Sequence, residues 1–383
     1  MGPRRLSDRR RGNIIVLSAF LMVVMLAFVA FACDVGYLCV IRTELQRSAD
    51  AAALAAAWEL ADEDGPGDEP STAEVSDRAR QVAAQYAALN LVGLKAPDLA
   101  DDDVEIGYIA DLKDPKSPFV EASGDQLPNA VRVRVQRTSL MNGEVPLFFA
   151  RVLGYNQSAV EATATAALQC TIRGFQTPGD GSNLGILPIA LDVESWDALM
   201  AGQGGDSYQY DENDNSTTTG SDGVLEINLY PGETGSAGNR GTLDIGGANN
   251  STSDVARQIV EGISPDDMLA LNQNGGTLEL DVNSELVLHG DTGLSAEIKE
   301  ELTAIIGQPR IVPLYSKVVN PGNNALYTIV KFVGIRVMYV DLTGSFKQKK
   351  VIVQPCPIVA SGGISSPGGQ TSEYIYSRAF LVR

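Results

Sequence analysis

The single histidine of the chain, His289, limits the chemistry that its side chains could perform. One histidine excludes most multi-histidine metal sites, and a Ser-His-Asp or Cys-His mechanism would have to use this residue. His289 lies in Leu288-His289-Gly290-Asp291, which reads as a turn after a strand, where we expect an exposed side chain rather than a catalytic one. The sequence has no Walker loop and no G-x-G-x-x-G motif after a strand. We therefore expect no catalytic residue and no cofactor.

An acidic, amide-rich segment is the nearest approach to a metal site. Asp211, Asn213 and Asn215 alternate as in a calcium-binding loop, and Asp222 stands at the twelfth position. Ser216 replaces the glycine that such a loop needs, and an aspartate replaces its bidentate glutamate. These departures favour a hydrated acidic loop, so we expect no metal, and the four named ligand positions are the weak calcium candidates.

The four cysteines fall into two pairs with different prospects. Cys33 and Cys39 are six residues apart in a predicted helix, so they face different sides and cannot form a disulfide within it. Cys170 and Cys356 flank the predicted C-terminal domain, and an oxidising compartment would favour a disulfide between them. Two buried thiols are the alternative for this second pair.

An apolar N-terminal segment is the element that positions everything else. Ile14 to Cys33 contains no charged residue, and at about 1.5 Å per residue it is about 30 Å long, which matches the hydrocarbon core of a bilayer. We predict a transmembrane anchor over residues 13–41. Strong helix formers then continue, so we predict that the helix extends into a stalk over residues 42–63. Asp34, near the outer end of the span, would be wetted at the interface.

Charge predicts the orientation of this anchor. Residues 1–12 form a basic segment with a formal charge of +4, from five arginines and one aspartate, whereas the whole chain carries −19 and the remainder therefore −23. Positive flanks stay in the cytoplasm, so we expect a cytoplasmic N-terminus, a single pass and an exoplasmic bulk, in the periplasm or at the cell surface. Such an acidic part, without a basic stripe, also excludes nucleic acid as a partner. The topology residues are Arg4, Arg5, Arg9, Arg10 and Arg11.

Two other interpretations of the N-terminus remain open. Ala30-Phe31-Ala32 resembles the A-x-A site of a cleaved signal peptide, although the apolar character runs past it to Ile41. Cys33 would be the acylated residue of a lipoprotein, although the bulky Phe31 two positions earlier fits such a site poorly. The long span leads us to expect a full-length, membrane-integral protein.

A specific order of residues surrounds and follows the span. It consists of Arg11-Gly12, the apolar span, Asp34-Val35-Gly36, Arg42-x-Glu44-Leu45-Gln46, and Ala49-Asp50-Ala51-Ala52-Ala53-Leu54-Ala55-Ala56-Ala57. This order resembles the N-terminal region of TadG-like Flp pilus-assembly proteins, which are part of the bacterial tight-adherence (Tad) machinery. The resemblance covers mainly residues 11–57, and Val145 to Gly154 with Ser158 to Leu168 extend it more loosely.

The resemblance implies a non-enzymatic, membrane-anchored component of a Tad/Flp pilus or a related envelope assembly. Type IV pilins and pseudopilins carry a glutamate five residues after the glycine at their cleavage site. Here the fifth residue after Gly12 is Leu17 and no glutamate precedes Glu44, which favours TadG-like proteins over pilins. Some TadG-like proteins have a D-x-S-x-S metal motif, but the nearest match here, Asp180 to Leu184, lacks the second serine. We therefore do not expect this chain to share the metal-dependent adhesion of those TadG-like proteins.

Apolar and small residues recur at spacings of three and four along the helix after the span. A narrow stripe of small residues lets another helix approach closely. We therefore predict that this small-residue stripe packs against other pilus-assembly or envelope proteins. An ordinary signal anchor with an alanine-rich stalk is the alternative. The stripe consists of Leu38, Ile41, Leu45, Ala49, Ala52 and Ala56.

The rest of the chain predicts an α+β fold in two exoplasmic parts. In residues 71–170, a capping box at Ser71 begins a helix and alternating segments predict strands, as in a small α+β unit. Residues 181–383 are rich in Gly, Ser and Asp and predict a mostly β domain with two helices. Ser253 or Asp254 would cap the first of these helices, and Leu294 to Ile306 would form the second.

The leading hypothesis is thus a membrane-anchored pilus-assembly component whose partners are the lipid bilayer and, through the N-terminal helix, other pilus-assembly or envelope proteins. The second hypothesis is a signal-anchored surface-binding module in which residues 181–383 bind a glycan or a protein. A ligand bound by the C-terminal part alone would favour the second hypothesis.

Overall fold

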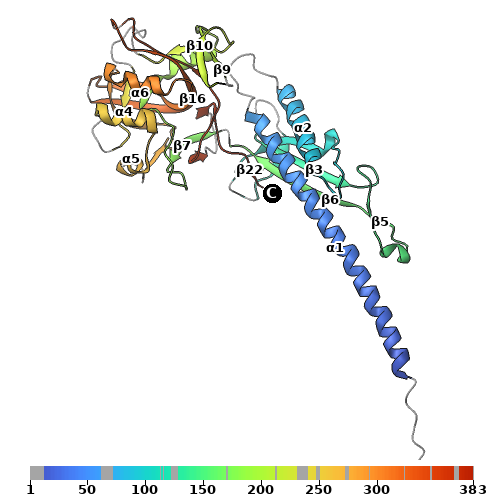
Figure 1. The fold of residues 1–383 in the computed structure, drawn as a ribbon. Helices are drawn as coiled ribbons and strands as arrows, with labels where there is room; N and C mark the ends of the chain where they lie inside the picture. Colours follow the sequence, from blue (N-terminus) through green and yellow to red (C-terminus); the bar gives the residue numbers. More distant parts are fainter. Residues whose placement is uncertain are drawn as a thin grey trace, which may run out of the picture.

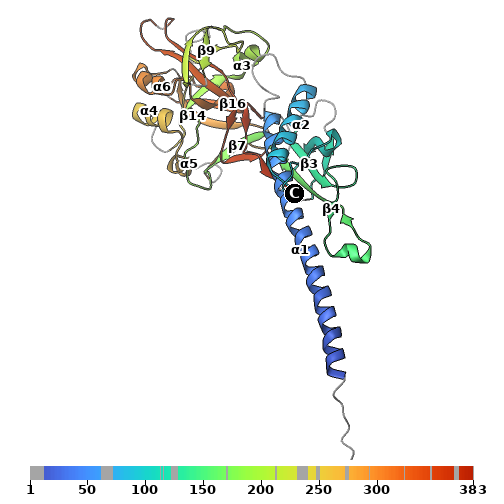
Figure 2. The same ribbon diagram turned by 45° about the vertical axis from the view of Figure 1, so that its right-hand side comes forward.

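One long N-terminal helix and two folded units make up the computed structural model of this protein (Figure 1). The helix leaves the first unit and projects away from it, and the second unit lies at the far end from the projecting part (Figures 1 and 2). The structure describes residues 13–61, 72–112, 114, 116–121, 128–169, 171–211, 214–230, 240–246, 251–271, 276–292, 294–322, 324–345, 347–365 and 371–382.

Helix α1 runs without interruption from Asn13 to Glu59, a length of 47 residues. Beyond Gly36 it contains neither glycine nor proline, and its alanines and leucines favour the helical state. Most side chains between residues 14 and 33 are exposed, whereas one face of α1 is fully buried from Ile41 onward. The same helix therefore lies in two environments: its first half is uncovered and its second half belongs to a protein core.

The first unit is an antiparallel sheet covered by two helices. Its strands have the order β2-β1-β3-β6-β22, and α1 and α2 pack on this sheet. Val131, Val133 and Val135 on β3 are buried, as their alternation predicts. The elements are α2 (Thr72–Leu89), η2 (Asp101–Asp103), β1 (Val104–Ile109), β2 (Phe119–Glu121), β3 (Ala130–Arg137), β4 (Val145–Pro146), η3 (Ala150–Leu153), β5 (Gln157–Ser158), β6 (Val160–Ala167) and β22 (Phe380–Leu381).

The small-residue stripe of α1 lies inside this unit, so the prediction that it packs against other proteins is wrong. Ile41, Leu45, Ala49, Ala52 and Ala56 are all 0% exposed, and they pack with residues of α2, β3 and β6. Alanines let the axes of α1 and α2 and the sheet approach closely, which is the property that the sequence pattern detected. The pattern is correct, but its partner is the same chain. Residues 42–59 are therefore a core helix and not a free stalk.

The second unit is built around strands that close into a ring. Strand β15 pairs with both β8 and β16, and the pairings β16-β14-β12-β8-β15 complete the ring. Strand β16 is long enough to pair with β14 near its start and with β17 near its end. The strands are β7 (Ile172–Gln176), β8 (Ile189–Asp192), β9 (Tyr208–Asp211), β10 (Ser216–Thr219), β11 (Ile227–Asn228), β12 (Gly241–Leu243), β13 (Thr277–Glu279), β14 (Leu286–Thr292), β15 (Pro309–Val319), β16 (Ala325–Asp341), β17 (Lys350–Pro355), β18 (Ile358–Val359), β19 (Gly363–Ser365), β20 (Ser372–Glu373) and β21 (Ile375–Tyr376).

Glycine 334 shows how tightly the long strand β16 is packed. A Cβ atom at Gly334 would lie 2.4 Å from the carbonyl oxygens of both Cys356 and Tyr374. Two other chain segments thus approach the strand backbone at a distance that only glycine permits.

The mixed α+β class predicted from the sequence is confirmed, but the second unit has more helices than the two expected. Helix α4 is capped by Ser251, earlier than the predicted Ser253 or Asp254, and the predicted helix over 294–306 is a 3₁₀ turn, η5, followed by the short α6. Two short helices were missed because each contains no more than eight residues, too few for a clear helical periodicity. The helices are α3 (Val193–Met200), α4 (Thr252–Glu261), α5 (Pro265–Ala270), η5 (Ala296–Ile298) and α6 (Lys299–Ala304).

The C-terminal end of the chain returns to the first unit. Strand β22 pairs with β6, with Phe380 opposite Ala167 and Leu381 opposite Ala166. Just before it, the backbone amide of Gln169 donates to Oγ of Ser377 at 2.9 Å. The predicted domain limits at residues 170 and 181 stay predictions, and the pairing adds that the last strand belongs to the first sheet.

We predict that enlarging a residue of the buried stripe destabilises the first unit. Ala52→Leu adds three carbon atoms where the side chain has no exposed surface, and such overpacking costs about 1–3 kcal/mol. The control is Ala73→Leu, the same change at an exposed position of α2. Denaturant unfolding of the full chain in detergent would measure both. Equal stability of the two variants would contradict the packing described here.

Candidate functional site at the outer end of the apolar helix

A loop between β4 and β5 lies beside the uncovered part of α1 (Figure 2). We call residues 147–155 the hairpin loop; it contains the single 3₁₀ turn η3. Gly154 has φ of 92°, a left-handed conformation that glycine adopts without strain, and it ends the turn. The loop is closed by its own backbone, since the amide of Leu147 donates to the carbonyl of Asn156 at 3.0 Å.

Asp34 of α1 holds the hairpin loop in place. Its Oδ1 accepts a hydrogen bond from the backbone amide of Phe148 at 2.8 Å, and its Oδ2 accepts from the amides of Phe149 at 2.9 Å and Ala150 at 2.6 Å. Three amides thus converge on one carboxylate, the arrangement that best stabilises a negative charge away from water. We expected Asp34 to be wetted, but it is only 4% exposed, so this expectation is wrong.

The hairpin loop and α1 also share apolar surface. A cavity of about 350 Å³ lies between them, lined mainly by alanine, leucine, valine and phenylalanine side chains. It includes Ala27, Ala30 and Phe31 from the apolar segment and Val152 and Leu153 from the loop. The rings of Tyr37 on α1 and Phe148 in the loop also meet edge to face, with centroids 5.5 Å apart.

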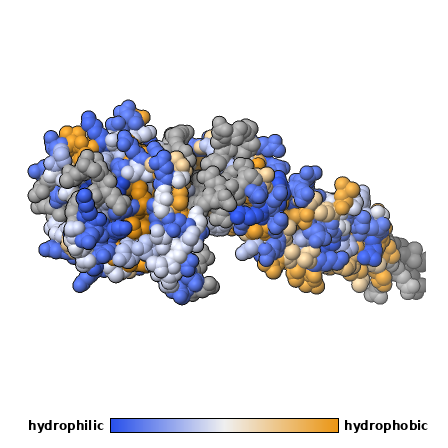
Figure 3. Space-filling model, turned by 90° about the horizontal axis from the view of Figure 1, so that it is seen from above, coloured by the Kyte–Doolittle hydropathy of each residue, from blue (hydrophilic) through white to orange (hydrophobic). Residues whose placement is uncertain are grey.

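The apolar segment itself has the properties needed to cross a membrane. Within the described residues, Ile14–Glu59 contains one stretch that is long and apolar enough for a span, and none of that stretch is buried against the protein. Viewed from above, hydrophobic surface is prominent at the end of the molecule that carries α1, and most of the opposite end is hydrophilic (Figure 3).

Several predicted site residues fall outside the described residues. These are the topology residues Arg4, Arg5, Arg9, Arg10 and Arg11, and also Cys170 and Asn213. Cys356 is 4% exposed. The Cys170–Cys356 disulfide therefore stays a prediction, as does the role of the five arginines.

The calcium candidates do not converge in the described part of the chain. Asp211 is the last residue of β9 and Asn215 directly precedes β10, whereas Asp222 lies beyond the opposite end of this hairpin, beside Asp206. The side chain of Asn215 accepts a hydrogen bond from the Tyr210 hydroxyl at 2.7 Å. Among described residues no group of three or more His, Cys, Asp or Glu side chains has a geometry suited to a metal ion.

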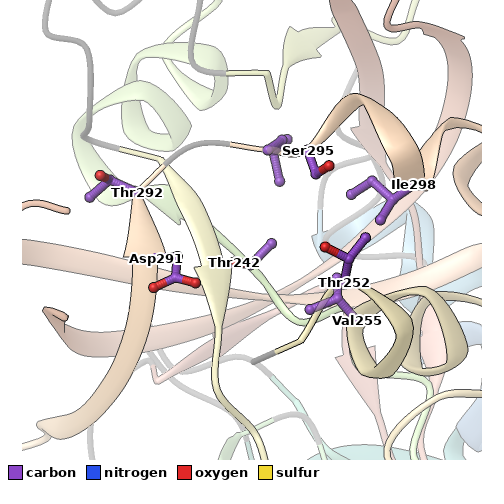
Figure 4. A pocket seen from close by; sticks show the side chains of 8 residues that line it. Thr242, Thr252, Val255, Asp291, Thr292, Ser295 and Ile298 are labelled. Carbon is purple, nitrogen blue, oxygen red and sulfur yellow. The ribbon is translucent and has the colours of Figure 1, made fainter. Parts of the chain in front are cut away.

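His289 is exposed as predicted, but it lies within β14 and not in a turn. Its strand contributes instead to a cavity of about 280 Å³ in the second unit. Figure 4 shows Asp291 and Thr292 of β14 on one side of this cavity and Thr252 and Val255 of α4 on the other. Thr242 and Ser295 add hydroxyl groups, so the walls are largely polar.

A largely buried ion pair in the second unit, between Arg240 and Asp192, is fully engaged by its neighbours. Nε of Arg240 donates to Oδ2 of Asp192 at 2.7 Å, and the same guanidinium donates to Oγ of Ser195 at 2.7 Å. Burial opposes ionisation of Asp192, but Arg240 and Ser195 together hold the pKa of this carboxyl below its usual value. The cluster joins β8 to the start of α3 and acts as structural support.

The comparisons with known families cover the region that contains Asp34 and the hairpin loop. Residues 12–59 match the Flp pilus-assembly TadE/G-like family, and residues 55–166 match the Tad-like Flp pilus-assembly family. Together the two matches cover residues 12–166, which we call the Tad-type region. The resemblance predicted mainly over residues 11–57 is confirmed, and it extends into β6. No curated protein and no solved structure matches the chain significantly.

The Tad-type region corresponds to a physical unit. It contains the apolar half of α1, the core half of α1, α2 and the strands from β1 to β6. The second unit, with its ring of strands, lies outside both matches.

We predict that removing the carboxylate of Asp34 releases the hairpin loop. In Asp34→Ala the amides of Phe148, Phe149 and Ala150 lose their acceptor, so their hydrogen exchange should accelerate by roughly tenfold or more. Glu44→Ala is the matched control, because Glu44 accepts one amide, that of Gly93, at 2.7 Å from the same helix. Exchange measured on the full chain in detergent tests this. Unchanged protection at all three loop amides would show that Asp34 does not hold the loop.

Proposed function

We propose that this protein is a non-enzymatic, membrane-anchored component of a bacterial Tad/Flp pilus or a related envelope assembly. The observation that carries the proposal is the continuity of α1 within the Tad-type region. One helix supplies both an uncovered apolar stretch and the central helix of the first unit, so anchoring and folding are mechanically linked. Such a unit is suited to hold its partners at a fixed height above a membrane.

The orientation that we propose has a cytoplasmic N-terminus and both folded units on the exoplasmic side. The five arginines before the span support it, because positive flanks are retained in the cytoplasm. The acidity of the remaining chain agrees with a soluble exoplasmic part.

Partner proteins are expected to contact α1 in its uncovered half. The small-residue stripe is occupied by α2 and the sheet, whereas most large apolar side chains between Ile14 and Phe31 are more than half exposed and form the main free apolar surface of this helix. In a bilayer this surface faces lipid or the spans of other assembly proteins.

A cross-linking experiment tests this function. With a photo-reactive amino acid in place of Val23, which is 65% exposed, we expect cross-links from membranes to other Tad/Flp pilus-assembly proteins. The control has the same amino acid in place of Val282, which is 96% exposed in the second unit. Mass spectrometry identifies the products. Lipid adducts alone at position 23, in cells that assemble the pilus, would contradict the proposed partnership through α1.

Charge reversal tests the orientation. Changing Arg9, Arg10 and Arg11 to Glu should weaken retention of the N-terminus in the cytoplasm, because these residues lie close to the end of the span. An introduced cysteine, Ser221→Cys, reports the location of the exposed second-unit loop through a membrane-impermeant thiol reagent, with the unmodified chain as the blank. Fully exoplasmic labelling in the charge-reversed chain would mean that other determinants set the topology.

The polar cavity of the second unit favours a second candidate function, a surface-binding module. Threonine and serine hydroxyls with the carboxylate of Asp291 are suited to hydrogen-bond a hydroxylated ligand such as a glycan. Binding of a glycan that is lost in Asp291→Ala, together with normal pilus assembly, would favour this alternative over the first.

A further inference from the structure

We propose that the hairpin loop is a second membrane contact, which inserts into the outer leaflet of the bilayer that α1 crosses and reaches the edge of its hydrocarbon core. This inference rests on the proposed membrane span of α1. The occupant of the exposed loop surface is lipid, and Asp34 is the internal acceptor that allows the loop backbone to lie at that depth.

The depth of the loop follows from its neighbours on α1. Val152 and Leu153 share a cavity with Ala27, Ala30 and Phe31, which belong to the charge-free segment. These three residues precede Asp34 by three to seven positions, or about 5–10 Å along the helix axis. If residues 14–33 span the hydrocarbon core, the tip of the loop lies below the outer surface of that core.

The side chains of the loop suit this location. Phe148, Phe149, Val152, Leu153 and Tyr155 are 53%, 48%, 85%, 78% and 68% exposed. Five large apolar or aromatic side chains on one short loop would be costly in water, whereas aromatic rings are favoured at the membrane interface. The uncovered side chains of α1 continue this apolar surface, so one bilayer can cover both.

Most backbone amides of the loop have hydrogen-bond partners, as a bilayer requires. Non-helical backbone at membrane depth is tolerated only where its polar groups have partners. Asp34 accepts the amides of residues 148–150, and within the loop the amides of Val152, Gly154 and Tyr155 donate to loop carbonyls at 3.1 Å each. The carboxylate of Asp34 therefore supplies the acceptor that these three amides would lack at membrane depth.

Arg151 supplies a contact for the lipid headgroups. Arg151 is exposed, and its Nε donates to the carbonyl of Leu147 at 3.2 Å, so the side chain lies at the surface of the loop. A long cationic side chain beside an apolar surface extends to the phosphate layer.

Quenching of tryptophan fluorescence by lipids brominated on their acyl chains tests the proposal. The full chain is reconstituted in vesicles as three variants, Val152→Trp in the loop, Leu21→Trp in the span and Leu269→Trp in the second unit. The native Trp58 and Trp196 are measured in the parent chain as background. We expect quenching of Val152→Trp that is about half as strong as that of Leu21→Trp or stronger, and none above background for Leu269→Trp.

The outcomes separate the loop from the anchor. Quenching at Leu21→Trp without quenching at Val152→Trp would overturn loop insertion and leave the anchor intact, whereas quenching at neither would contradict the span itself. Adding Asp34→Ala to Val152→Trp should abolish most of the loop quenching, while adding it to Leu21→Trp should not. Unchanged loop quenching in the Asp34→Ala variant would overturn the role of Asp34.

Discussion

Close packing of small side chains along α1 against the sheet beneath it is the constraint on which the rest of the architecture depends. Ala49, Ala52 and Ala56 have no exposed surface, and they bring the helix axis close to α2, β3 and β6. Because α1 does not break before this contact, the direction of the apolar segment is fixed by the core of the first unit. A continuous helix thus connects a protein core to the apolar segment, with no linker between them.

This continuity explains how the carboxylate of Asp34 can hold the hairpin loop, which is distant from it in sequence. The hairpin loop is attached to β3 and β6, which are themselves packed on α1, so the loop returns to α1 at a defined height. At that height Asp34 meets three backbone amides 114 to 116 residues away in sequence. An isolated aspartate at the end of an apolar segment is energetically costly, but here the three amides stabilise its negative charge.

The second unit is connected to the first unit by both ends of its chain. It begins after β6, and the chain that leaves it forms β22, which pairs with β6 in the first unit. Two connections restrict rotation more than one would, so a ring of strands with a polar cavity is held on the side away from the apolar segment. This arrangement suits a protein that presents one surface from a fixed base.

The sequence by itself determined the local features. The length of the apolar segment predicted a helix that could span a membrane, and helix propensity predicted the uninterrupted α1. Alternation predicted the buried valines of β3, and a specific order of residues carried the Tad-type resemblance. Each of these features depends on neighbours within one or two turns or on direct similarity. The short helices α3 and α5 were missed, although Asp192 before one and Ser264 with Asp267 at the other are recognisable cap signals.

Only the tertiary structure decided what each surface meets. A stripe of small residues predicts close packing, but it does not show whether the packing partner is another protein or the same chain. The reason is that periodicity carries no information about distant segments. The same limit applies to Asp34, whose amide partners are far away in sequence, and to the ring of strands, whose closure depends on pairings such as β8 with β15. The sequence determined the elements, and the long-range contacts decided which faces they bury and which they leave exposed.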